Sequence, residues 1–370
     1  MKFGLFNLMS IRDNPGGTAG VISDTRKMVR IAEEIGFDVA WFAEHHFTNY
    51  SISPSPLMLA AHFAGSTRTI RLGAAVVVLP LYQPMRVAQE IALVDQLSDG
   101  RLVLGVGSGY QPYEFDRLGA DVAHKTEIFL EYWDIVEQAL LDGKVEFHGR
   151  FADIPPSVVG LRTVNGRMPE LYLTSLDPRV VRRLSGHDVI PFITAGWRGS
   201  SALIDTAAKA EQAWTEAGLR GRPMPLAVQQ YIHVTDHRHE ALEAAERARF
   251  VGRAAAALRA PNLSLQGAAL AEEPMDAEPG LETFRDNLLI GDAAYVAERL
   301  IAEITALKPA HYNCFFQFGD MPIDRASRSL QRFATQVLPL VEAELGPLDR
   351  LESGRATPSL SDALMASAGR

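Results

Sequence analysis

The chain has 370 residues, of which 47% are hydrophobic and 22% charged, a balance typical of a globular protein with a large core. Its 36 Lys and Arg against 45 Asp and Glu leave a net charge of −9 without long runs of one sign, which argues against a nucleic-acid-binding or anionic-membrane surface. The single cysteine, Cys314, excludes an intrachain disulfide framework and a cysteine-based zinc site, and its apolar surroundings, YNCFF, predict a buried thiol.

The N-terminal residues, MKFGLFNLMS, lack the long apolar core and the cleavage site of a secretory signal. No later stretch of the sequence is apolar over the length that a bilayer-spanning helix needs. We therefore expect a cytoplasmic protein with neither a membrane nor a nucleic acid as its partner.

Short apolar runs alternate with longer amphipathic runs from the first residue onward, as in repeated βα units. The predicted strands are, in chain order, Lys2–Asn7, Asp38–Ala43, Ile70–Leu79, Leu102–Val106, Leu171–Thr174, Val189–Ile193, Leu226–Val234 and His311–Phe316. The predicted helices between them include Asp24–Ile35, Ser55–Ala64, Pro84–Leu97, Lys125–Leu141, Ser201–Ala217 and Arg238–Leu258. Eight strands with interleaved helices predict a closed (β/α)₈ TIM barrel, and an open doubly wound sheet is the alternative.

Three segments interrupt the alternation. Residues 143–169 contain three prolines and four glycines and predict a long excursion with a hairpin. Residues 259–287, rich in Ala, Glu and Pro, predict an inserted loop, and loops of this length often act as lids. Residues 346–370 are polar and rich in small side chains and predict a disordered tail, so we expect one barrel domain over residues 1–345.

The stretch WFAEHHF (41–47) places two adjacent histidines at the end of a predicted strand. Successive side chains of a strand point to opposite faces, so at most one of His45 and His46 should face an enclosed site. A metallohydrolase barrel would be expected to carry His-x-His on one strand face, so this arrangement disfavours a metal. Glu44 and the aromatic neighbours favour one working histidine, although a hydrogen-bonded structural histidine is also possible.

The stretch GVGSGY (105–110) follows the fourth predicted strand and superficially resembles a dinucleotide fingerprint. Its third glycine comes too early for that motif, and we expect no helix immediately after it. The glycines either let a flat or phosphorylated ligand approach the backbone or only form a tight turn.

Thr174 and Ser175 follow the fifth predicted strand and supply hydroxyl groups. Asp177-Pro178 directly after them predicts the start of a helix, with Asp as the N-cap residue. The hydroxyls and the free amides of the helix suit a phosphate group, although the same residues would also serve as a helix cap alone.

The sequence resembles the luciferase-like monooxygenase family. The resemblance rests on MKFGLFNL at the N-terminus, EEIGFDVAWFAEHHF (33–47), SPLMLAAHFAGSTRTIRLGAAVVVLPLYQPMRVAQEIALVDQLSDGRLVLGVGSGY (55–110), NLLIGDAAYVAERL (287–300) and SLQRFATQVLPLV (329–341), which lie in family order. It implies a (β/α)₈ barrel that binds FMN, as FMNH₂ from a separate flavin reductase, and that activates oxygen at the flavin C4a position.

The resemblance also implies roles for individual residues. His45 matches the family's catalytic histidine, which stabilises or protonates the oxygenated flavin. Ala74 and Ala75 match a pair that contacts the isoalloxazine ring and is joined by a non-prolyl cis peptide bond. The other implied cofactor-binding residues are Ala43, Glu44, Ser108, Gly109, Tyr110, Thr174 and Ser175.

The substrate side of the site is expected to be dry, since water would intercept a reactive oxygenated flavin. Phe6, Phe42 and Phe47 lie at strand ends and are expected to form this wall, with Phe6 and Phe47 against the substrate and the segment 259–287 closing over it.

Two positions depart from the luciferase pattern. Gly107 stands where luciferase has a reactive cysteine, which argues against light emission from a long-chain aldehyde. Ser108 stands where luciferase has a phosphate-binding arginine, which leaves the phosphate to hydroxyls, amides and Arg179.

The leading hypothesis is therefore an FMN-dependent monooxygenase that uses O₂ to hydroxylate, or to oxygenate in a Baeyer–Villiger reaction, an apolar or aromatic small molecule. An F420-dependent dehydrogenase that transfers hydride is the alternative within the same superfamily, and the EHH stretch favours FMN over F420. A non-catalytic subunit like the luciferase β chain is a third hypothesis, against which the retention of His45 argues. The resemblance also implies a homodimer.

Overall fold

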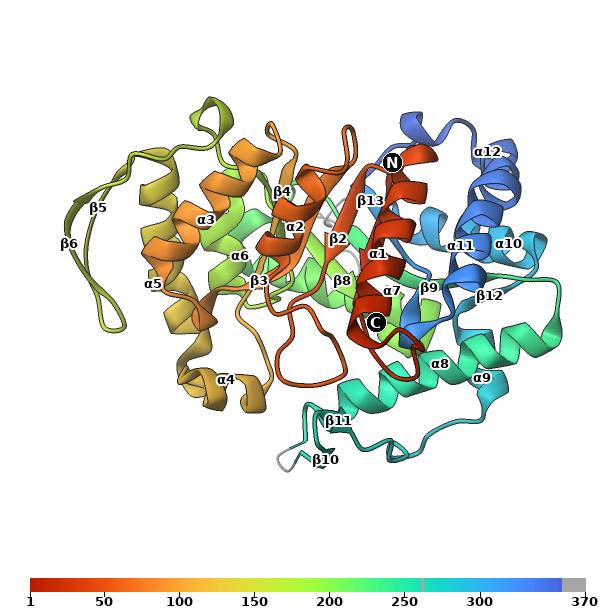
Figure 1. Cartoon of the computed structure of the whole chain (residues 1–370). Helices are drawn as coiled ribbons and strands as arrows, with labels where there is room; N and C mark the ends of the chain where they lie inside the picture. Colours follow the sequence, from red (N-terminus) through yellow and green to blue (C-terminus); the bar gives the residue numbers. More distant parts are fainter. Residues whose placement is uncertain (261–262, 355–370) are drawn as a thin grey trace, which may run out of the picture.

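The computed structural model, which describes residues 1–260 and 263–354, is a closed barrel of eight parallel strands surrounded by helices (Figure 1). Strand β9 pairs with both β13 and β8, and this pairing closes the ring, so the alternative of an open sheet is wrong. The barrel strands are β1 (Lys2–Asn7), β2 (Val39–Phe42), β3 (Arg71–Val78), β4 (Leu102–Gly107), β7 (Glu170–Leu173), β8 (Ile190–Thr194), β9 (Ala227–Val234) and β13 (His311–Phe315). All eight predicted strands are confirmed, and none of their ends is displaced by more than one residue.

The helices follow the strands in the order expected of βα units. They are α1 (Gly17–Glu34), α2 (Pro56–Ala64), α3 (Pro84–Leu97), α4 (Pro112–Leu118), α5 (Lys125–Leu141), α6 (Pro178–Leu184), α7 (Gly199–Trp214), α8 (Arg238–Ala257), α9 (Leu281–Asn287), α10 (Ala293–Leu307), α11 (Ile323–Arg332) and α12 (Leu338–Leu345). Helix α1 begins seven residues before the predicted Asp24, because the glycine-containing stretch GTAG at its start gives little helical signal.

Several helix starts are set by local sequence. Pro56, Pro84, Pro112 and Pro178 each occupy the first turn, where a missing backbone N–H costs nothing. The Asp177 side chain accepts a hydrogen bond from the Arg179 amide at 2.9 Å, as the predicted N-cap should. These caps fix where each helix leaves the carboxyl end of its strand.

The barrel interior is filled by large side chains around Trp41 of β2. The Trp41 ring lies 4.8 Å from the ring of Tyr172 and 5.4 Å from that of Phe192. A Cβ atom at Gly73 would lie 2.2 Å from the indole, so the residue beside Trp41 on β3 must be glycine. This layer fills the interior around Trp41, and the large cavity lies toward the carboxyl ends of the strands.

The segment 143–169 contains the predicted hairpin, formed by the antiparallel strands β5 (Lys144–His148) and β6 (Asp153–Val158), which extends away from the barrel beside α5 (Figure 1). The segment 259–287 contains a second small hairpin, β10 (Leu265–Gln266) and β11 (Ala269–Leu270), and helix α9. A short strand, β12 (Leu289–Gly291), follows and pairs with the end of β9.

Residues 346–354, the first part of the predicted tail, lie within the described part of the chain. Leu348 is buried, and its carbonyl oxygen accepts a hydrogen bond of 2.7 Å from the N-terminal amine. The remainder of the predicted tail, 355–370, lies outside the described residues. Among the helices of the described residues, none combines the length and the apolar character that crossing a bilayer requires.

Candidate active site

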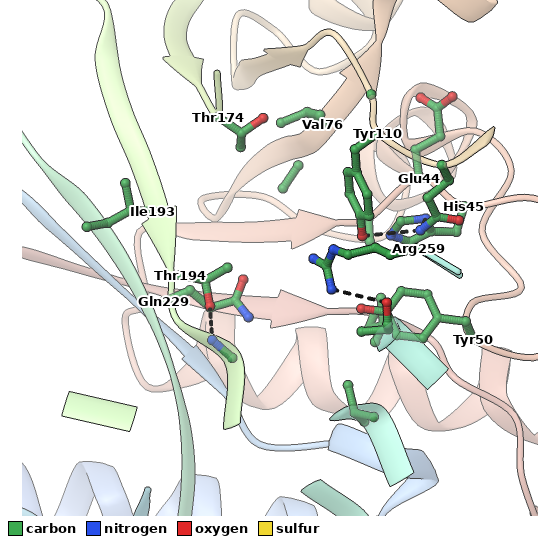
Figure 2. Close-up of a pocket in the computed structure, with 18 of the residues that line it drawn as sticks. Glu44, His45, Tyr50, Val76, Tyr110, Thr174, Ile193, Thr194, Gln229 and Arg259 are labelled. Atoms are coloured by element: carbon green, nitrogen blue, oxygen red, sulfur yellow. Dashed lines mark hydrogen bonds between the residues drawn. The ribbon is translucent and has the colours of Figure 1, made fainter. Parts of the chain in front are cut away.

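A cavity of about 800 Å³ opens at the carboxyl ends of the barrel strands, within the size range of small-molecule sites. Each of the eight barrel strands, or the residues directly after it, contributes to the lining. The residues that represent the eight strands in chain order are Phe6, His45, Val76, Ser108, Thr174, Ile193, Tyr231 and Phe315. Several of them are drawn in Figure 2. This is the end of the barrel where side chains from all strands converge.

His45 faces the cavity and is held by groups from a different part of the chain. Its Nδ1 atom lies 3.2 Å from Oε1 of Glu114 and 3.1 Å from the side-chain amide of Gln111. Because a carboxylate accepts hydrogen bonds, Glu114 favours the tautomer with its proton on Nδ1. In that tautomer Nδ1 cannot also accept from the Gln111 NH2 group, and the Gln111 side-chain oxygen has no hydrogen-bond partner among the described residues. The other ring nitrogen, Nε2, is then the one that can accept a proton from a bound ligand or return it.

His46 does not line the cavity, so only one of the two adjacent histidines faces it, as expected. The reason is not strand alternation, since β2 ends at Phe42 and the consecutive residues 43–45 all line the cavity. The Nε2 atom of His46 lies 3.0 Å from Oε1 of Glu44, whose other oxygen accepts hydrogen bonds from the Val78 amide (3.0 Å) and the Tyr82 hydroxyl (2.9 Å). Burial opposes the charged form of His46, but Glu44 outweighs it and raises the pKa of His46 above its ordinary value. Burial likewise raises the pKa of Glu44, although these hydrogen bonds oppose it. Glu44 therefore joins β2, β3 and His46.

The cavity gathers most of the side chains that the sequence singled out. Those that line it are Phe6, Ala43, Glu44, His45, Ala75, Ser108, Gly109, Tyr110, Thr174 and Ser175. Phe42, Phe47 and Ala74 do not line the cavity. Phe42 is fully buried and stacks on Phe63 of α2 at 4.9 Å, while Phe47, with a positive φ of 65°, turns outward and is 47% exposed.

The expected cis peptide bond lies one residue later than predicted. It joins Ala75 to Val76, and the described residues contain no other. Strand β3 shifts its register against β4 between Ala74 and Val77, and Ala74 is fully buried on the strand. The pair that borders the cavity is therefore Ala75 and Val76 rather than Ala74 and Ala75.

The glycine-rich stretch 105–110 serves the packing of the protein as well as the cavity. Gly109 has a φ of +72°, and a Cβ atom there would lie 2.6 Å from both Phe115 and Val78. Gly109 therefore also serves the packing of the loop, which the sequence analysis did not foresee.

Helix α4 starts at Pro112, almost directly after the glycine-rich stretch, so the expectation that no helix follows is wrong. Pro112 is the local signal that predicts this helix start.

Polar side chains also line the cavity. Thr174 and Ser175 line it as predicted, and Lys125, at the start of α5, lines it too and donates a hydrogen bond of 2.7 Å to the Gly109 carbonyl. Burial lowers the pKa of Lys125, as expected of an ammonium without a carboxylate partner. Arg179 is absent from the lining and forms ion pairs with Asp177 and Glu127, so it is not available as a phosphate ligand.

Several lining residues were missed by the sequence analysis. Glu114 and Lys125 lie on helices, Tyr231 lies inside β9 and Arg259 follows α8, and no local motif marks any of them. The closed barrel brings them to one cavity. The alternation of buried and lining side chains in β9 could have suggested Tyr231, but nothing local marks the others. The described residues contain no cluster of three or more His, Cys, Asp or Glu side chains arranged as metal ligands.

The inserted segment is bound to the barrel at several points. Arg12, in the loop after β1, forms ion pairs with Glu246 of α8 at 2.7 Å and with Glu272 of the insertion at 2.6 Å. The Leu270 amide donates to the side chain of Asn49 at 2.8 Å, and the Leu270 side chain is buried. These contacts hold the insertion against the loops after β1 and β2, and its residues Arg259 and Met275 line the cavity.

Comparison with known proteins identifies the family of this chain. The model of the luciferase-like monooxygenase family matches residues 1–307. The chain belongs to this family. A protein of Sinorhizobium fredii designated y4vJ is 37% identical over 94% of this chain and 99% of its own length. The oxygenase component of the flavin-dependent trigonelline monooxygenase of Acinetobacter baylyi is 26% identical over 92% of this chain and 95% of its own length.

Solved structures share the fold at low sequence identity. The oxygenating constituent of 3,6-diketocamphane monooxygenase from Pseudomonas putida, in complex with FMN, has a TM-score of 0.70 and 20% identity over 92% of this chain and 98% of its own. An F420-dependent secondary alcohol dehydrogenase has a TM-score of 0.67 and 18% identity over the same shares of the two chains. One of these neighbours holds FMN and the other an F420 adduct, and at this level of identity they show that the fold is shared.

Proposed function

We propose that the chain is the oxygenase component of an FMN-dependent monooxygenase, which oxygenates an apolar or aromatic small molecule by hydroxylation or a Baeyer–Villiger reaction. The observation that carries the proposal is His45 at the edge of a large cavity, with one ring nitrogen held by Glu114 and the other left for a ligand. A flavin reductase as supplier of FMNH₂, a homodimer and a cytoplasmic location belong to the same proposal.

The residues of the cavity fit FMN. Lys125, Thr174 and Ser175 supply a cation and two hydroxyls for a phosphate, and Lys125 lacks a carboxylate partner that a phosphate would have to displace. Ala75, Val76 and Ile193 give an apolar surface for a flat ring system. Reduced FMN, when bound, supplies the electrons for oxygen activation.

The chain's own residues then bind, shield and handle a proton. Phe6, Phe315 and Tyr231 form an aromatic wall, with ring centroids 5.2 Å apart for the first two and 5.0 Å for the last two, and this wall excludes water from the reacting atoms. His45 holds or moves one proton at Nε2, and Glu114 keeps the ring in the required tautomer. Ser53 helps to place the strand end, since its carbonyl accepts the His45 amide at 3.0 Å.

The test is anaerobic mixing of the protein with reduced FMN followed by oxygen, with oxygen uptake and hydrogen peroxide release recorded together. We expect the native chain to take up oxygen well before peroxide appears, and we expect this delay to shorten at least tenfold in His45→Ala, the loss typical of a proton-transfer group. His46→Ala, which alters the histidine outside the cavity, is the matched control.

Immediate peroxide release from the native chain, without binding of reduced FMN, would contradict the proposal. A titration with F420 would then test the dehydrogenase alternative. Equal behaviour of native and His45→Ala chains, with FMN bound, would support a non-catalytic subunit instead.

A further inference from the structure

Three cationic side chains line the cavity, namely Lys125, Arg198 and Arg259. Within the described part of the chain, no carboxylate lies within 4.0 Å of the charged nitrogens of these three residues. The two carboxylates that line the same cavity, Glu44 and Glu114, are both engaged by histidine rings. The cavity therefore carries positive charge that its own acidic groups do not neutralise, which favours an anionic ligand.

Arg259 differs from Lys125 in its position. It follows the last turn of α8 and is exposed, whereas Lys125 lies with Gly109 near the end of β4. Figure 2 shows the Arg259 side chain between Tyr110 and Tyr50. Its guanidinium lies 4.8 Å from the ring centroid of Tyr110 and donates a hydrogen bond of 3.1 Å to the Ala255 carbonyl. A guanidinium has five N–H donors, so donors remain for a ligand.

Three tyrosines line the same cavity as this guanidinium, and Tyr110 lies directly beneath it. Burial raises the pKa values of Tyr50, Tyr110 and Tyr231, and the charge of Arg259 opposes this rise at each of them. Their phenols therefore stay protonated at neutral pH and keep O–H donors. A guanidinium beside neutral phenols can bind a carboxylate through charge-assisted hydrogen bonds.

We propose that Arg259 is the residue that binds a carboxylate on the substrate, so that the enzyme acts on a small organic acid whose apolar or aromatic part lies along Phe6, Tyr231 and Phe315. This proposal rests on the proposed function, because it assigns Lys125, Thr174 and Ser175 to the cofactor and leaves Arg259 to the substrate. It refines the substrate class from apolar or aromatic molecules to acids with an apolar or aromatic body.

The test measures binding, without turnover, of a set of aryl and alkyl carboxylic acids and of the matching primary amides to the full-length protein, by thermal shift and calorimetry. We expect some acids of the set to bind, each at least about tenfold more tightly than its amide. Arg259→Met should weaken the acids about 10- to 100-fold and the amides little, and Arg259→Lys should recover part of the difference.

Two controls separate the possible outcomes. Arg238→Met, which removes an exposed arginine at the opposite end of α8, should leave the preference for acids unchanged. FMN binding, measured by quenching of flavin fluorescence, should be the same in the native chain and in Arg259→Met.

The proposal is overturned if no acid binds more tightly than its amide, if Arg259→Met keeps the preference, or if this variant weakens FMN instead of the acids. Because none of these measurements uses oxygen, failure of the oxygenase proposal would show separately, as immediate peroxide release in the mixing experiment.

Discussion

His45 shows how a residue acquires its chemistry from a distant part of the chain. Its place at the end of β2 follows from the local sequence, but its partner Glu114 lies 69 residues later, in the first turn of α4. The same carboxylate oxygen accepts the backbone amide of His46 at 2.8 Å. Glu114 therefore positions both the ring and the backbone of the histidine pair, and it acts through His45 rather than on a ligand.

Replacing Glu114 by Gln tests this positioning role. The amide can keep the hydrogen bond from the His46 amide but loses the charge that favours the Nδ1 proton, so we expect the delay between oxygen uptake and peroxide release to shorten about tenfold, less than in a variant that lacks the imidazole. FMN affinity should not change. A purely structural role would instead lower FMN affinity together with the delay.

The inserted segment 259–287 is the element whose role the sequence left most open. Arg12 connects it to α8 through Glu246 and Glu272, and the guanidinium also lies 4.8 Å from the ring of Phe250. The insertion contributes Met275 as well as Arg259 to the cavity lining. Its closure over a bound ligand remains a prediction.

Arg12→Met should loosen this element without unfolding the barrel. Partly exposed ion pairs of this kind contribute about 1 kcal/mol or less each, so the global stability should fall only slightly. Cleavage by a protease within residues 259–287 should become faster, and FMN together with a bound acid should slow it in the native chain. Limited proteolysis with mass spectrometry measures both effects, and an unchanged pattern in Arg12→Met would show that Arg12 does not hold the insertion.

At the scale of the whole molecule, the closed barrel buries a histidine that takes no part in the site. His233 of β9 is 1% exposed, and neither ring nitrogen has a hydrogen-bond partner within the described residues. Burial lowers the pKa of His233 to about 4. The imidazole of His233 is therefore neutral in the folded protein at neutral pH.

This burial predicts a stability that depends on pH. The unfolded chain binds a proton at His233 below about pH 6.5, while the folded chain does so only near pH 4, so the free energy of unfolding falls as the pH falls between these values. The loss from this group should be about 2 kcal/mol between pH 7.5 and 5. Urea unfolding at the two pH values should show a correspondingly smaller loss in His233→Leu; an equal loss in both chains would contradict the assignment.

The sequence by itself determined the strands, the TIM barrel and the helix cap at Asp177, because these follow from local periodicity and from proline and Asp signals. The family resemblance added His45 and most of the cavity lining. Only the tertiary structure decided that Val76 rather than Ala74 borders the cavity, since a register shift in β3 changes which side chains face inward. It also decided the partners Glu114, Lys125 and Arg259, because closure of the barrel brings together side chains from distant segments that no local pattern relates.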